Sequence, residues 1–151
     1  MDTAQQDTQP GEQLSGGELL TAISNRVVSI MRTHYGRGPT KAKTYVLDDL
    51  VVVVLRNGFT AIEQTLVDKG ESDQVVDRRR DFQRLMAEEY KQAVLEMTGR
   101  NVVAFMSQAH LEPDLTLEIF FLDGPLPGFG TLELLTPGED GVHGEEVPQG
   151  E

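Results

Sequence analysis

Apolar residues recur at intervals of three and four along residues 19–34, which predicts an amphipathic helix with one face against a core. Ser15 and Glu18 have the spacing of a capping box, so we expect the helix to begin after Ser15. Gly36 suits the left-handed conformation that ends a helix, and Pro39 prevents continuation. These signals agree, and they define the first helix at both ends.

Two further helices are predicted in the middle of the chain. Thr60 and Glu63 repeat the capping-box spacing and indicate a short helix that ends near Gly70. A long helix is expected over about residues 72–98, because Gly99 is a typical C-terminal cap. Its inner face is predicted from apolar residues at helical spacing: Val75, Phe82, Met86, Tyr90, Ala93 and Met97.

The remaining segments have the pattern of strands. Residues 44–47 and 50–55 predict a hairpin that turns at Asp48 and Asp49, since aspartate tolerates the left-handed conformations of a tight turn. The second of these strands is apolar throughout, which is typical of a strand covered on both faces. Residues 101–108 and 115–122 predict a second hairpin.

The predicted fold class is therefore α+β, with the order α-β-β-α-α-β-β and a four-stranded antiparallel sheet that carries its helices on one face. The last strand contains two alternating sets of residues. We expect one set to face the core, Leu115, Leu117, Ile119 and Phe121, and the other to face outward, Thr116, Glu118, Phe120 and Leu122. Apolar residues on the helix-free face, at Val51 to Val54 and Phe120, need cover, and the simplest cover is a second copy of the chain.

The formal net charge of −12 is unevenly distributed. Residues 1–16 and 124–151 contain nine acids and no base, whereas residues 17–123 have a net charge of only −3. Such acidic ends, the second rich in glycine and proline, are typical of disordered segments. We therefore expect one α+β domain over residues 17–123, between a disordered N-terminal arm and a disordered tail.

Composition excludes several functional classes. The chain has no cysteine, which rules out disulfide frameworks, thiolate zinc sites and cysteine nucleophiles. No apolar run approaches the roughly 20 residues of a membrane helix, and residues 1–16 lack the features of a signal peptide. We expect a soluble cytoplasmic protein that does not insert into membranes, and the acidic charge disfavours nucleic acid as a partner.

Residues 36–43 form the most suggestive candidate site. Glycines expose backbone amides there, and Arg37, Lys41 and Lys43 supply positive charge, which together suit a phosphate, carboxylate or bicarbonate ion. The segment lacks the ending of a P-loop, and it follows a helix C-terminus, whose negative dipole disfavours an anion. A structural turn and an anion site containing Arg37, Gly38, Lys41 and Lys43 therefore both remain open.

A second positive cluster lies at residues 78–84. Consecutive arginines point about 100° apart around a helix, and nearby acids can neutralise them, so a solvated, salt-bridged face is one interpretation. An acidic ligand bound by Arg79 and Arg80 is the other. Arg79 follows Val75 by four residues and precedes Phe82 by three, which directs it inward, toward the sheet or a dimer partner.

Signatures of catalysis and of metal binding are missing from the sequence. His34, His110 and His143 are far apart and do not have the spacing of metal ligands. Asp48 and Asp49 alone make a poor calcium or magnesium site. No serine lies in a nucleophile elbow. We therefore predict no cofactor and no enzymatic activity.

Short motifs across the predicted domain carry a family resemblance: Tyr35-Gly36-Arg37-Gly38-Pro39; Leu50 to Leu55 with Phe59, Thr60 and Glu63; Arg80; Thr98-Gly99-Arg100; and Ile119-Phe120-Phe121-Leu122. Together they resemble a bacterial family named for MpsC, which is associated with a sodium-translocating, membrane-potential-generating system. Phe59 stands where the family more often has leucine, which is a conservative change. The resemblance implies a small soluble accessory protein, sometimes encoded beside bicarbonate or sodium transport components, and it implies no catalytic residues.

These observations favour a non-enzymatic, homodimeric accessory or regulatory protein that is linked to bicarbonate or sodium transport and senses a small anion. The expected partners are a second copy of the chain and another protein, such as a membrane transport component. The alternative is a nucleotide- or phosphate-binding enzyme that uses the loop from Gly36 to Lys43.

Overall fold

The computed structural model describes residues 14–130. Its elements follow the predicted order: α1 Gly16–Tyr35, β1 Lys41–Leu47, β2 Leu50–Arg56, α2 Ala61–Asp68, α3 Ser72–Thr98, β3 Val102–His110 and β4 Leu115–Leu122. The strands form one antiparallel sheet in the order β1-β2-β4-β3, so the two hairpins join through β2 and β4. The predicted α+β fold is therefore confirmed.

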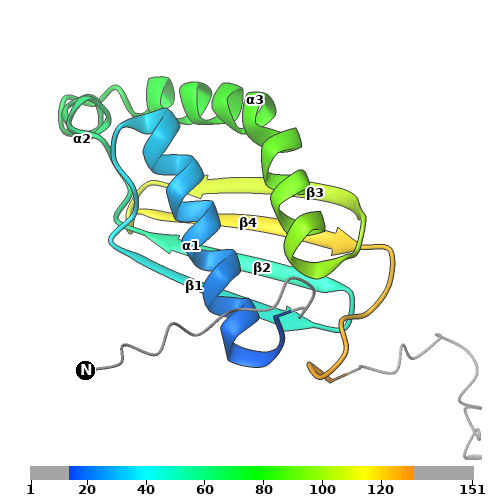
Figure 1. Cartoon of the computed structure of the whole chain (residues 1–151). Helices are drawn as coiled ribbons and strands as arrows, with labels where there is room; N and C mark the ends of the chain where they lie inside the picture. Colours follow the sequence, from blue (N-terminus) through cyan, green and yellow to red (C-terminus); the bar gives the residue numbers. More distant parts are fainter. Residues whose placement is uncertain (1–13, 131–151) are drawn as a thin grey trace, which may run out of the picture.

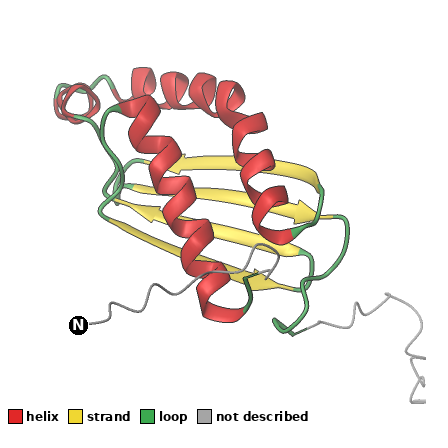
Figure 2. Cartoon of the chain, viewed as in Figure 1, coloured by secondary structure: helices red, strands yellow, loops and turns green. Residues whose placement is uncertain are grey.

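The helices form a single layer against the sheet. Figures 1 and 2 show α1 and α3 side by side across one face, with α2 beyond the end of the strands. Helix α1 lies over β1 and β2, and α3 lies over β3. The core between the layers contains buried residues from all of these elements, among them Ile23, Val27, Val51, Val53, Met86, Tyr90, Val94 and Phe120.

Glycine ends the two long helices, as the sequence predicts. Gly36 has φ 74° and its N–H donates to the carbonyl of Arg32, while Gly99 has φ 70° and its N–H donates to the carbonyl of Leu95. Both residues use the left-handed conformation that glycine adopts without steric strain. The first cap directs the chain from α1 into β1.

One of the two predicted capping boxes is present in the structure. At α2, the Thr60 hydroxyl accepts from the N–H of Glu63, and the Glu63 carboxylate accepts from the N–H of Thr60, so the predicted capping box is confirmed. At α1, Ser15 occupies the N-cap position, but its side chain makes no capping hydrogen bond. The capping box predicted for Ser15 and Glu18 is therefore wrong.

The prediction for the two faces of β4 is also wrong. The set Thr116, Glu118, Phe120 and Leu122 is buried beneath the helices, and the set Leu115, Leu117, Ile119 and Phe121 lies on the helix-free face. The large side chains of Phe120 and Leu122 fill the space under the helices, and the Phe120 ring lies 5.1 Å from the ring of Phe105. Because side chains alternate along a strand, Thr116 and Glu118 are buried with them.

Residues 124–130, which follow β4, contact the β1–β2 turn. Asp48 has φ 55°, as a tight aspartate turn requires. Its N–H donates to the carbonyl of Gly130, and its carbonyl accepts from the N–H of Leu126, which is buried in the core. Residues 124–130 of the predicted tail thus contact the domain. The rest of the two predicted disordered ends, 1–13 and 131–151, lies outside the described residues.

Candidate functional site

The sheet face opposite the helices is the largest functional candidate. No element of residues 14–130 covers this open face (Figure 1). Register and alternation place four rows of four side chains on it, from β1, β2, β4 and β3 in turn. The rows are Leu47, Leu50, Phe121 and Ala104; Tyr45, Val52, Ile119 and Met106; Lys43, Val54, Leu117 and Gln108; and Lys41, Arg56, Leu115 and His110. The open face is thus apolar over most of its area and basic at one end.

The basic end contains a hollow of about 550 Å³ on β1 and β2. Lys41, Lys43 and Arg56 line this basic hollow, together with Thr40, Tyr45 and Val54. The Lys43 ammonium lies 5.0 Å from the centre of the Tyr45 ring, which is close enough for a cation–π contact. Within residues 14–130, none of the three cations forms an ion pair. The hollow therefore presents positive charge that is available to an anion.

The structure brings together only part of the predicted anion site. Lys41 and Lys43 share the basic hollow, and Arg56, which the sequence analysis missed, joins them as the cross-strand partner of Lys41. The hairpin turn at residues 48–49 already implies that pairing. Arg37 is exposed in the turn after α1. Gly38 lies against α1, where an added Cβ atom would be 3.2 Å from Val28 Cγ1, so its close packing favours glycine.

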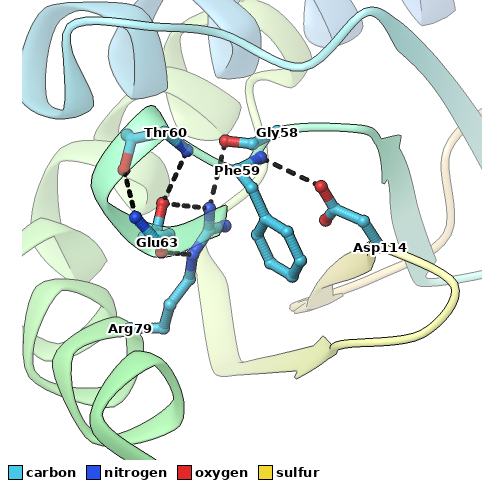
Figure 3. A network of polar contacts seen from close by, with 6 residues as sticks. All are labelled: Gly58, Phe59, Thr60, Glu63, Arg79 and Asp114. Atoms are coloured by element: carbon cyan, nitrogen blue, oxygen red, sulfur yellow. Dashed lines mark hydrogen bonds and ion pairs between the residues drawn. The ribbon is translucent and has the colours of Figure 1, made fainter. Parts of the chain in front are cut away.

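Arg79 lies inside the protein, 2% exposed. Figure 3 shows its guanidinium against the carboxylate of Glu63, with Nε donating to Oε2 at 2.5 Å and a terminal nitrogen donating to Oε1 at 2.8 Å. The same terminal nitrogen donates to the Gly58 carbonyl at 3.1 Å. The rings of Tyr35 and Phe59 lie 4.9 and 5.4 Å from the guanidinium carbon. The inward direction predicted for Arg79 is therefore confirmed.

The Arg79 network connects α2 and α3 to the β3–β4 turn. Burial alone raises the pKa of Glu63, but the hydrogen bonds and charge of Arg79, with the Thr60 N–H, outweigh it and hold that pKa below its usual range. Asp114 in the β3–β4 turn accepts from the N–H of Phe59 at 2.9 Å, and burial raises the pKa of this carboxyl (Figure 3). These contacts fix the segment before α2 and support a structural role.

Arg80 lies on the other side of the sheet from the basic hollow. It lines a groove of about 300 Å³ between α3 and β3, together with Gln83, Arg84, Ala87, Lys91, Phe105 and Ser107. Two cations of this groove have acidic neighbours one helical turn away, because Arg84 pairs with Asp81 at 2.5 Å and Lys91 pairs with Glu88 at 3.2 Å. The residues predicted to bind an anion thus occupy separate parts of the fold.

A buried polar niche lies beneath the groove. Tyr90 Oη, Ser107 Oγ and Glu118 Oε2 are buried and have no hydrogen-bond partner of normal geometry within residues 14–130. Ser107 and Glu118 are cross-strand neighbours. Burial raises the pKa of Glu118 to about 7, and the nearby Ser107 hydroxyl and Arg79 charge oppose this effect only in part. The pKa of Tyr90 is also raised, mainly by burial and to a smaller extent by the negative charge of Glu118.

Residues 14–130 contain no group of three or more side chains that could hold a metal ion. None of the helices in this part of the chain is long and apolar enough to cross a membrane.

Fold and surface together define a small two-layer α+β domain with one open, largely apolar sheet face. The chain belongs to the family described as the Na+-translocating membrane potential-generating system (MpsC), which matches residues 15–124. The resemblance found in the sequence motifs is thereby confirmed. Neither a curated protein nor a solved structure matches the chain.

Proposed function

We propose that this protein is a non-enzymatic accessory or regulatory component of a Na+-translocating, membrane-potential-generating system and that it works as a homodimer. The family description supplies the link to Na+ translocation. The single observation that carries the rest is the open face, where Tyr45, Leu47 and Met106 are 51%, 43% and 49% exposed. Contiguous apolar surface of this kind marks a site of protein contact.

A second copy is the occupant that the size of the open face supports. Four strands about 4.8 Å apart and seven residues long, at about 3.3 Å each, span roughly 19 by 23 Å. Stacking two such faces buries roughly 900 Å² of flat surface, and the side chains that project from the sheets add to this area. The total is close to the approximately 1,000 Å² of buried surface expected of a stable interface. Sheets also stack face to face in a self-complementary way about a two-fold axis.

Light scattering on the full chain tests the dimer. Val52 and Ile119 are cross-strand partners at the centre of the open face, so Val52→Glu and Ile119→Glu should each give a folded monomer by circular dichroism. Leu85→Glu is the matched control, because Leu85 is 79% exposed on α3, away from the sheet. A wild-type chain that stays monomeric at tens of micromolar would remove the homodimer from the proposal.

The proposal includes recognition of a small anion such as bicarbonate or phosphate. Three cations without ion pairs line the basic hollow, and clustered cations bind compact anions through charge-assisted hydrogen bonds. Thermal-shift titration should show stabilisation by one of these anions that Lys41→Ala and Lys43→Ala abolish. Arg37→Ala serves as the companion variant, because Arg37 lies outside the hollow. Equal shifts for wild type and all three variants would argue against this site, and a shift specific to nucleotides would favour a nucleotide-binding enzyme.

A further inference from the structure

The ends of the open face carry opposite charge, and this difference determines how two copies can pair. We propose that the two copies stack about a two-fold axis that lies between the sheets and runs perpendicular to the strands. This proposal rests on the homodimer proposed above. Each acidic turn, at Asp48 and Asp49, then meets the basic hollow of the other copy.

The register fixes which charges lie at which end. Lys41 pairs with Arg56 at one end of the β1–β2 hairpin, and Leu47 pairs with Leu50 beside the turn at the other end. A two-fold axis perpendicular to the strands lays β1 on β1 and β2 on β2 in opposite directions. Lys41 of one copy therefore lies over the Leu47 end of the other, to within the roughly 30° tilt that sheet twist imposes.

The charged groups at both ends are available for this contact. Within residues 14–130, neither Asp48 nor Asp49 forms an ion pair, and the three cations of the basic hollow form none either. In the proposed pairing, Arg56 approaches Asp49 of the other copy across the Leu50 position. The aliphatic stems of Lys41 and Arg56 cover Leu47 and Leu50, while their charged groups reach the turn.

The other symmetric arrangement is less favourable. A two-fold axis parallel to the strands lays β1 on β3, and it brings the basic ends of both copies together. Six cations then lie at one end of the interface, over Gln108 and His110 of the sheet. The acids at this end are Glu112 and Asp114 of the β3–β4 turn, and Asp114 already accepts from the N–H of Phe59. The central apolar rows stack in either arrangement, for example Val52 and Ile119. Like-charge contacts therefore decide between the two axes, and they favour the perpendicular axis.

A charge exchange across the interface tests this geometry by sedimentation equilibrium of the full chain. Arg56→Glu and Asp49→Lys should each weaken the dimer by about tenfold or more, because each places like charges at both symmetric contacts. An equimolar mixture of the two variants should restore wild-type affinity, since every contact in the mixed dimer again joins opposite charges. The double variant should do the same, although residues 49 and 56 lie roughly 20 Å apart along one strand.

Arg78→Glu, on the exposed surface of α3, is the control for the change in net charge and should leave the affinity unchanged. A tighter dimer for Arg56→Glu would overturn the geometry and indicate the parallel axis. A dimeric wild type without rescue in the mixture would also overturn it, while the proposed homodimer would stand. A wild type that stays monomeric in the same experiment would overturn both proposals.

Discussion

Glu118 offers a quantitative test of the buried side of the sheet. Its side chain is 1% exposed, and burial raises its pKa to about 7. The groups that act on it from neighbouring elements are the Ser107 hydroxyl of β3 and the Arg79 guanidinium of α3, and both favour the charged form. Tyr90 of α3 contributes an uncharged hydroxyl. The carboxyl therefore prefers its neutral form in the folded chain more strongly than in the unfolded chain.

The sign and size of the effect on stability follow from the two pKa values. Because the pKa is about 7 in the folded chain and 4.5 without the fold, the stabilisation from protonated Glu118 is fully present below about pH 4.5. This stabilisation, roughly 3 kcal/mol in total, is lost as the pH rises through about 7. The chain has a pI of about 4.6, so pH 5.5 to 8.5 is the practical window, and it covers roughly 2 kcal/mol.

Urea denaturation of wild type and Glu118→Gln across that window measures the effect. The variant keeps a neutral side chain at every pH, so its free energy of unfolding should rise by about 2 kcal/mol relative to wild type between pH 5.5 and 8.5. Glu112→Gln, in the exposed β3–β4 turn, should follow the wild-type profile. Parallel profiles for Glu118→Gln and wild type would refute the assignment of a neutral, buried carboxyl.

Three further predictions concern the core, a helix end and the dimer. Arg79→Met leaves the Glu63 carboxylate buried without its partner and should cost about 3–5 kcal/mol in urea denaturation, whereas a loss under 1 kcal/mol would show that the pair is unimportant. In Gly36→Ala the added Cβ atom has no neighbour within 4 Å, but residue 36 must keep φ 74°. Thermal melting should therefore show a loss of about 1 kcal/mol in the free energy of unfolding, from backbone strain alone. Phosphate should weaken the dimer at constant ionic strength by competing for Lys41 and Lys43, and an unchanged dissociation constant would separate anion binding from pairing.

The order of elements could be predicted from sequence because each element has local signals that agree. Gly36 and Gly99 end their helices, Thr60 and Glu63 begin α2, and Asp48 adopts the positive φ expected of the turn. The Ser15 cap was wrong because a matching spacing does not ensure that the hydroxyl turns toward the backbone. Local signals thus fix where elements lie and leave their side-chain contacts undetermined.

The candidate site could be predicted only in part, because it depends on contacts between distant segments. Lys41 and Lys43 were found from local charge, but Arg56 joins them only through the cross-strand register. Helical periodicity predicted that Arg79 points inward, yet its pairing with Glu63 depends on the position of α2 against α3. Sequence spacing carried no information on that packing.

The distribution of polar and apolar residues on the two faces of β4 bears on the proposed interface. In a sheet that is covered on one face only, apolar residues normally lie beneath the helices and polar residues face water. Here Thr116 and Glu118 lie beneath the helices, while Leu117 and Ile119 lie on the open face. The polarity of this strand therefore predicts the wrong face, because polar residues are buried and apolar residues lie on the open face. Covering a half-exposed aliphatic side chain stabilises an assembly by about 1 kcal/mol, so this pattern favours a chain whose sheet is completed by a second copy.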